Sequence, residues 1–188
     1  MNEIFAKECF KSHIDALNKF DVSKIYDACQ LIINSLKNDS TIFWCGNGGS
    51  ASQANHLSAE LLGGMKKKKI NPFKSICLNT DSAFITAWSN DDKFENIFKR
   101  QLEANGAKND ILIGLSTSGN SQNIIEASKY AKSIGMKVIS FTGNNGGELK
   151  QYSNLNINID SNETPRIQEV HILIGHIICD LIEQHYKS

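Results

Sequence analysis

The chain has 188 residues, of which 40% are apolar and 21% charged, and its 20 acidic side chains balance its 20 basic ones. This length fits one domain with one core, and the composition excludes a disordered or a membrane protein. A protein that bound nucleic acid over its whole surface would be more basic, so no nucleic-acid partner is expected.

The first forty residues have apolar positions at helical spacing, which predicts one or two amphipathic helices packed on a sheet or on another subunit. Short apolar runs then alternate with helical segments, and the predicted strands cover residues 41–45, 74–79, 110–115, 137–142 and 155–159. This alternation favours a doubly wound α/β domain with a five-stranded parallel sheet. A long C-terminal helix is predicted over residues 163–186, with Pro165 at its start. Residues 1–188 are thus expected to form one domain, in which a helical segment (1–40) precedes the α/β core and final helix (41–188).

The five cysteines are an odd number without a C-x-x-C pair, and most of them lie inside apolar runs. They are predicted to be reduced core thiols in a reducing compartment. The N-terminal segment carries charges every few residues, unlike a signal peptide, and no run approaches membrane-spanning length. A cytoplasmic protein without a membrane partner is therefore expected.

A glycine-rich turn, CGNGGSASQANH, follows the first predicted strand and leads into a helix. Gly46, Gly48 and Gly49 let the backbone approach a ligand closely, and the helix start offers unpaired N–H groups. A tight turn capped by Ser50 is the plain alternative. A dinucleotide site is disfavoured, because neither G-x-G-x-x-G nor a P-loop is present.

The segment STSGNSQN again joins a predicted strand to a helix. Ser116, Thr117, Ser118 and Ser121 place four hydroxyls around one glycine at the helix start. Such hydroxyls and amides can coordinate a phosphate without lysine or arginine. One serine would be enough for a helix cap, so the crowding favours phosphate binding over capping alone.

Two helices carry candidate ligands or bases. His56 and Glu60 are four residues apart and share one helix face, where they could bind a divalent metal, supply a base or merely stabilise the helix. In the final helix, Gln168 and His176 are eight residues apart, about 80° around the axis, and could face one site. His171 points elsewhere, and a histidine on an apolar helix is often a satisfied core residue.

Six segments together carry a family resemblance: CGNGGS, HLSAEL, SNDD (residues 89–92), STSGNS, TGNNGG and RIQEVHILIGH. In content and order they resemble the phosphoheptose isomerases of the sugar isomerase (SIS) family, from about Phe5 to the C-terminus. The resemblance implies a flavodoxin-like fold and a homotetramer with active sites between subunits. It also implies conversion of sedoheptulose 7-phosphate to D-glycero-D-manno-heptose 7-phosphate, through an enediol, for lipopolysaccharide or capsule heptose.

The resemblance also assigns residues by position. It implies substrate binding by Asn47, Gly48, Gly49, Ser50, Glu60, Asn90, Asp91, Ser116, Thr117, Ser118, Ser121 and Gln168. It implies one zinc ion per subunit, held by His56, Glu60, Gln168 and His176. Glu60 is expected to be the base that moves the proton between C1 and C2, with His176 serving the two oxygens.

Two departures from the family pattern stand out. Familiar members read L-T/S-G-R after the glutamate, whereas this chain has LLGG, ending at Gly64. Pro165 replaces an aspartate that some members carry. The lysine run at residues 66–69 is expected to be a solvated surface, or else to attract an anionic substrate.

The alternative from another class is a non-enzymatic binding protein with the same fold and tetramer, similar to the bacterial replication-initiator-associating protein. The segment LNTDSAFITAWSNDD resembles that branch. Its members lack the helix glutamate and the final histidine, so the presence of Glu60 and His176 favours an enzyme. An arabinose phosphate isomerase would usually carry further regulatory domains.

Overall fold

The structure is a computed structural model that describes residues 2–66 and 71–186; residues 67–69 of the lysine run lie outside this part. The helices are α1 (Glu3–Asn18), α2 (Ser23–Leu36), α3 (Gly49–Gly63), α4 (Ser82–Asp91), α5 (Ile97–Asn105), α6 (Gln122–Ser133) and α7 (Thr164–His185), with 3₁₀ turns η1 (Phe94–Asn96) and η2 (Glu148–Tyr152). The strands are β1 (Ile42–Gly46), β2 (Ser75–Cys77), β3 (Ile111–Ser116), β4 (Lys137–Gly143) and β5 (Leu155–Ile159). Each predicted strand is present within two residues of its predicted bounds, and the long final helix is confirmed.

The five strands form one sheet in the order β2-β1-β3-β4-β5, and every neighbouring pair is parallel. This is the flavodoxin-like order, so the predicted fold class is confirmed. The order reverses between β1 and β3. Ligands of such sheets bind at the carboxyl ends of the strands beside this reversal, where the turn after β1 and the turn after β3 lie.

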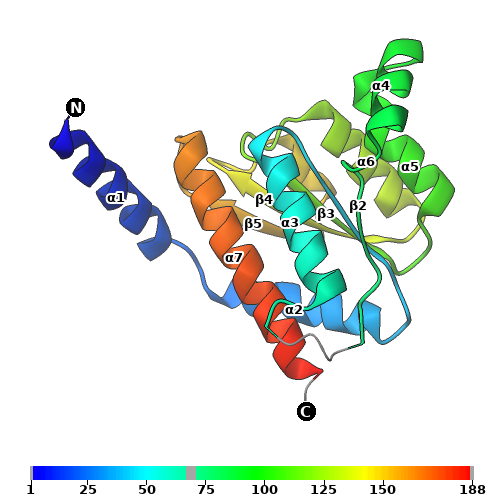
Figure 1. Cartoon of the computed structure of the whole chain (residues 1–188), viewed down its shortest axis with the longest axis horizontal. Coiled ribbons are helices and arrows are strands. Elements are labelled where there is room, and N and C mark those ends of the chain that lie inside the picture. Colours follow the sequence, from blue (N-terminus) through cyan, green and yellow to red (C-terminus); the bar gives the residue numbers. More distant parts are fainter. Residues whose placement is uncertain (1, 67–70, 187–188) are drawn as a thin grey trace.

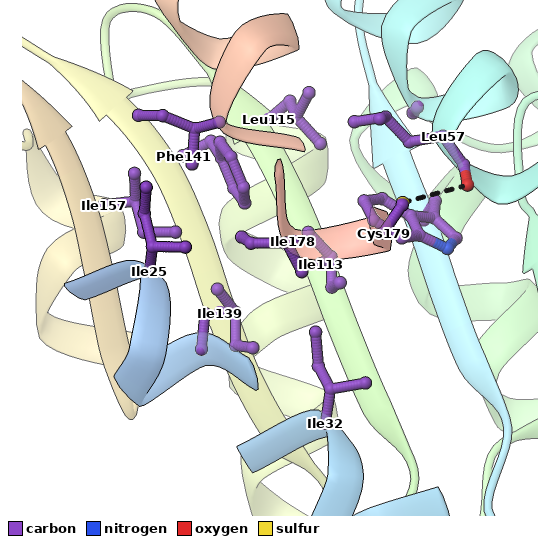
Figure 2. Packing of buried hydrophobic residues seen from close by; sticks show 14 of the residues in the cluster. Ile25, Ile32, Leu57, Ile113, Leu115, Ile139, Phe141, Ile157, Ile178 and Cys179 are labelled. Carbon is purple, nitrogen blue, oxygen red and sulfur yellow. Dashed lines mark hydrogen bonds between the residues drawn. The ribbon is translucent and has the colours of Figure 1, made fainter. Parts of the chain in front are cut away.

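Helices cover both faces of the sheet (Figure 1). Along β1, Ile42 and Trp44 join the core beneath α2, α3 and α7, whereas Phe43 and Cys45 join the core beneath α5 and α6. This alternation follows from the two-residue period of a strand. Figure 2 shows the first core, where side chains of β3, β4 and β5 meet those of the three helices.

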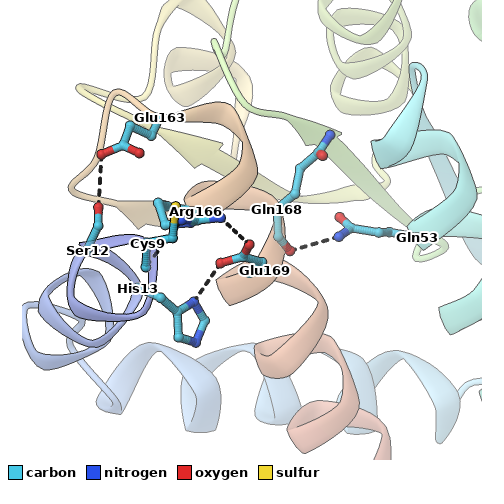
Figure 3. A network of polar contacts seen from close by, with 8 residues as sticks. All are labelled: Cys9, Ser12, His13, Gln53, Glu163, Arg166, Gln168 and Glu169. Carbon is cyan, nitrogen blue, oxygen red and sulfur yellow. Dashed lines mark hydrogen bonds and ion pairs between the residues drawn. The ribbon is translucent and has the colours of Figure 1, made fainter. Parts of the chain in front are cut away.

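Helix α1 extends beside the start of α7, away from the sheet (Figure 1). Polar contacts tie the two helices together (Figure 3): the Arg166 guanidinium donates to the Cys9 carbonyl and pairs with Glu169, which also pairs with His13. Helix α1 buries Ala16 and packs Leu17 against the core, whereas Ile4, Phe5, Phe10 and Ile14 are exposed. The predicted N-terminal helices are therefore present, but only α2 is a substantial part of the core.

Helices α3 and α7 run parallel and approach closely at Gly175. A Cβ at this position would lie 2.4 Å from Leu57 Cδ1, and Leu57 is itself fully buried. The thiol of Cys179, one turn further along α7, donates to the Leu57 carbonyl over 3.9 Å (Figure 2). The absence of a side chain at position 175 thus sets how closely the two helices pack.

Replacing Gly175 by alanine is expected to lower the free energy of unfolding by about 1–3 kcal/mol, because the added methyl group overpacks the contact with Leu57. Urea denaturation followed by circular dichroism measures this change. Gly63→Ala is the matched control, since a Cβ there meets nothing within 4 Å. Equal stabilities of the two variants would contradict the role given to Gly175.

Candidate functional site

The glycine turn after β1 is shaped by contacts from two other segments. The Asn79 carboxamide brackets Gly46, accepting from its N–H at 3.1 Å and donating to its carbonyl at 2.9 Å. Gly48 has φ +54°, a backbone conformation that disfavours side chains. A Cβ at Gly49 would lie 2.9 Å from the Gln168 amide. The predicted turn is thus present, and its glycines are required by its shape.

The four hydroxyl residues after β3 surround the start of α6. Ser116 Oγ lies 2.9 Å from Ser121 Oγ and 3.5 Å from Ser118 Oγ. Ser121 occupies the N-cap position, yet its hydroxyl turns to Ser116 and makes no capping hydrogen bond within the described chain. Capping alone therefore does not explain this cluster. Ile124 N–H is bonded to Asn123 Oδ1 and to the Ser121 carbonyl, whereas no side chain of the described chain caps the N–H groups of Gln122 and Asn123, where an anion could bind. We call Ser116, Thr117, Ser118 and Ser121 the hydroxyl cradle.

The glycine turn and the hydroxyl cradle are joined by a pair of amides. The carboxamides of Asn47 and Asn123 exchange two hydrogen bonds, each 2.9 Å long. Sequence reasoning placed Asn47 in the site but missed Asn79 and Asn123. Both missed asparagines lie in loops or helix starts, where asparagine is common, and no local spacing indicates their distant partners.

Three of the four predicted metal ligands come together between α3 and α7. His56 Nε2 lies 2.8 Å from His176 Nε2 and 3.4 Å from Glu60 Oε1, and the three ligand atoms lie within 4.8 Å of one another. Neighbouring ligands of a tetrahedral zinc ion are about 3.3 Å apart, given bonds of about 2.0–2.1 Å. Two imidazoles and one carboxylate in this arrangement fit a zinc ion and leave a fourth position for a further ligand.

Gln168 lies at the other end of the α3–α7 contact. Its side-chain amide is 3.4 Å from Ser50 Oγ, and its backbone carbonyl accepts from Gln53 Nε2 at 2.8 Å (Figure 3). Eight residues of α-helix span about 12 Å, so within one chain Gln168 and His176 occupy different levels of α7. Its role as a metal ligand stays a prediction, whereas its contact with the glycine turn suits substrate binding.

Asn90 and Asp91 lie at the exposed C-terminal end of α4, where the Asn90 amide donates to Asp91 Oδ1 at 2.9 Å. Helix α4 packs against η1 and α5, in the layer opposite α3 and α7. Their contact with the sugar stays a prediction.

Comparison with known proteins identifies the family of the chain. Residues 8–143 match the SIS domain family. The chain is 45% identical to the phosphoheptose isomerase of Helicobacter pylori strain Shi470, over 97% of this chain and 92% of the relative. It is 46% identical to the phosphoheptose isomerase of a Nitratiruptor species, over 86% of each chain.

The chain belongs to the phosphoheptose isomerases of the SIS family. The structure of a phosphoheptose isomerase from Francisella tularensis superposes with a TM-score of 0.90 at 33% identity, covering 98% of this chain and 100% of the other. The enzyme from Neisseria gonorrhoeae gives a TM-score of 0.85 at 38% identity, covering 96% of each chain. The family prediction is thus confirmed, and these relatives give no support to the non-enzymatic alternative.

Both departures from the phosphoheptose isomerase pattern fall at helix ends. Gly64 follows the last residue of α3 with φ +81°, where a side chain would be strained. Just beyond it, Lys66 pairs with Asp180, one turn of α7 beyond His176. Pro165 lies in the first turn of α7, where its missing N–H costs little.

His171 is a buried core residue outside the candidate metal cluster. Its Nε2 lies 3.0 Å from the Thr142 carbonyl oxygen, and its ring packs edge-on against Phe141. Burial lowers the pKa of His171 to about 4, because the charged imidazolium would lose its hydration. The prediction that this histidine points away from the other site residues agrees with this position.

The low pKa of His171 makes stability depend on pH. Between the ordinary value of 6.5 and about 4, the unfolded chain binds a proton that the folded chain excludes, so stability falls as pH falls through this window. We expect His171→Gln, which keeps a donor for the Thr142 carbonyl, to remove about 2–3 kcal/mol of this loss. Urea unfolding of the parent and the variant at pH 7.0 and 4.5 measures this loss of stability. An equal loss in both proteins would contradict the low pKa of His171.

Proposed function

We propose that this chain is an aldose–ketose isomerase that converts sedoheptulose 7-phosphate to D-glycero-D-manno-heptose 7-phosphate, for lipopolysaccharide or capsule heptose. The main support for the proposal is that the Glu60 carboxylate lies beside the imidazoles of His56 and His176. The chain is also related over nearly its whole length to phosphoheptose isomerases. A carboxylate and an imidazole are the groups that proton transfer between neighbouring carbons requires.

In the proposed mechanism, the hydroxyl cradle and the α6 N-terminus hold the phosphate, and the glycine turn binds the sugar. Glu60 removes the C1 proton of the ketose while His176 gives a proton to the C2 oxygen, which forms the enediol. Glu60 then returns its proton to C2, and His176 takes the proton of the C1 hydroxyl. Atoms and protons balance, and the product is the aldehyde.

We further propose that His56, Glu60 and His176 hold one zinc ion per subunit. The ion would polarise the carbonyl group and stabilise negative charge on the neighbouring oxygens. His56 would only bind the ion. With the Nε2 atoms of His56 and His176, which lie 2.8 Å apart, as ligands, the proton that His176 exchanges would be the one on Nδ1. The family resemblance implies Gln168 as the fourth ligand, but its contact with Ser50 at the glycine turn supports a role in substrate binding.

A homotetramer with sites between subunits is also proposed. Leu173 and Ile177 are exposed on either side of His176, and α1 exposes further large apolar residues, namely Ile4, Phe5, Phe10 and Ile14. Glu60 lies more than two turns of α3 beyond the glycine turn of its own subunit. A second subunit that packs on this apolar surface could therefore bring its own substrate-binding residues close to Glu60.

We place the protein in the cytoplasm on the strength of its cysteines, all five of which are free thiols. Across residues 2–66 and 71–186, the structure contains no helix long and apolar enough to span a membrane.

Glu60→Gln is expected to reduce kcat for sedoheptulose 7-phosphate by about 10²–10⁴-fold, because the amide cannot accept the carbon-bound proton. NMR follows the formation of the aldoheptose phosphate, and circular dichroism checks the fold. Glu103→Gln, on the surface of α5, is the matched control and should retain parental turnover. Turnover near the parental rate in Glu60→Gln would refute the assignment of the base.

Zinc binding is expected at one ion per subunit in the dialysed protein, measured by elemental analysis and by calorimetry after chelation. His56→Ala should abolish it, since one of three converging ligands is lost, whereas His13→Ala, which contacts Glu169 at the α1–α7 contact, should not. Gln168→Ala decides whether that amide is a ligand: unchanged zinc affinity excludes it. A parent protein without zinc affinity would contradict the metal proposal.

A further inference from the structure

A reciprocal amide pair connects the two turns that flank the reversal of strand order. Asn47 Nδ2 donates to Asn123 Oδ1, and Asn123 Nδ2 donates to Asn47 Oδ1, each over 2.9 Å. The two residues are 76 positions apart in the chain. Asn47 belongs to the glycine turn after β1, and Asn123 lies in the first turn of α6, directly after the hydroxyl cradle.

The orientation of the pair is fixed from the α6 side. Asn123 is only 2% exposed, and its Oδ1 also accepts from the Ile124 N–H at 3.0 Å. This backbone donor requires the oxygen of the Asn123 amide to face it, and the amide of Asn47 must then present its nitrogen to the same oxygen. Among residues 2–66 and 71–186, each of the two amide nitrogens has one hydrogen-bond partner, so Asn47, which is half-buried, can also contact a ligand.

Asn47 also fixes the start of α3. Its backbone carbonyl accepts from the N–H groups of Ser50 at 3.0 Å and Ala51 at 3.3 Å. The same residue therefore holds the first turn of α3 with its backbone and the first turn of α6 with its side chain. Asn47 therefore links the starts of the two helices that follow the glycine turn and the hydroxyl cradle.

We propose that Asn123 is a positioning residue of the isomerase, which acts through Asn47 to set the distance between the glycine turn and the hydroxyl cradle. A sugar phosphate bound by both turns needs this distance, and misplacement by about 1 Å can cost about 100-fold in rate. The inference rests on the proposed isomerase function. Asn123 itself does not touch the substrate.

The alternative is that the amide pair only stabilises the fold, and the two roles must be told apart by more than a loss of stability. Removing a buried hydrogen-bonded amide destabilises any protein, by about 1–3 kcal/mol, so a lower Tm distinguishes nothing. Inorganic phosphate does distinguish the two roles, because it needs only the hydroxyl cradle, whereas the sugar phosphate needs both turns. Positioning therefore predicts weaker catalysis with unchanged competitive inhibition by phosphate.

The experiment compares the full-length parent with Asn123→Asp, Asn123→Ala, Asn47→Ala and the double alanine variant. The aspartate is isosteric but sets an oxygen against Asn47 Oδ1. We expect kcat/KM for sedoheptulose 7-phosphate to fall about tenfold or more in every variant, with the inhibition constant of phosphate within about twofold of the parent. The double variant should be no worse than Asn47→Ala, because the two residues act as one unit.

Asn154→Ala is the matched control, since Asn154 Oδ1 accepts from the Val138 N–H at 2.9 Å, at the end of the sheet away from the cradle. It should lower Tm and leave kcat/KM unchanged. If Asn123→Ala does not fold, Asn123→Asp decides the question, since it keeps the shape of the side chain and the acceptor for the Ile124 N–H.

Three results would overturn the inference: variants with parental kcat/KM, additive losses in the double variant, or a phosphate inhibition constant that rises in step with KM. The first of these, with an active parent, leaves the proposed function standing. A parent that does not isomerise any ketose phosphate would overturn the proposed function and this inference together.

Discussion

The close parallel contact of α3 with α7 is the constraint on which the candidate site depends. Gly175 lets the helices approach until Leu57 fills the space between them. At this distance His56 and Glu60 of α3 lie beside His176 of α7, and the Gln168 side chain contacts the glycine turn. Without this contact, His56 and Glu60 would still share a helix face, but their partner would be missing.

A second constraint acts at the carboxyl ends of the strands. There the backbone leaves the sheet in two turns, which Asn123 joins through its hydrogen bonds with Asn47, while Asn79, after β2, holds Gly46 at the start of the glycine turn. Side-chain amides can donate and accept at once and carry no charge. These contacts therefore position the turns without adding a charge that would compete with a phosphate.

The parts of the fold and site that the sequence predicts are those governed by local periodicity. The strands were predictable because buried parallel strands are continuous apolar runs, and the pairing of His56 with Glu60 because they lie one helical turn apart. Gln168 and His176 were predicted to share one site because they lie about 80° apart around the axis of α7. The helical rise over two turns separates them along that axis. Asn123 could not be recognised, because its partner is 76 residues away and asparagine is common at helix starts.

The hydroxyl cradle has no charged side chain, so it cannot neutralise the negative charge of a substrate. In the proposed site, Ser116, Thr117, Ser118 and Ser121 would bind phosphate through hydroxyls and amides, so the phosphate would keep most of its negative charge. Isomerisation then develops further negative charge on the oxygens of the enediol, at the other end of the sugar. Since Gly64 stands where familiar members have a basic residue, the compensating positive charge has to come from elsewhere. In the proposed site, a dication held by His56, Glu60 and His176 would supply it.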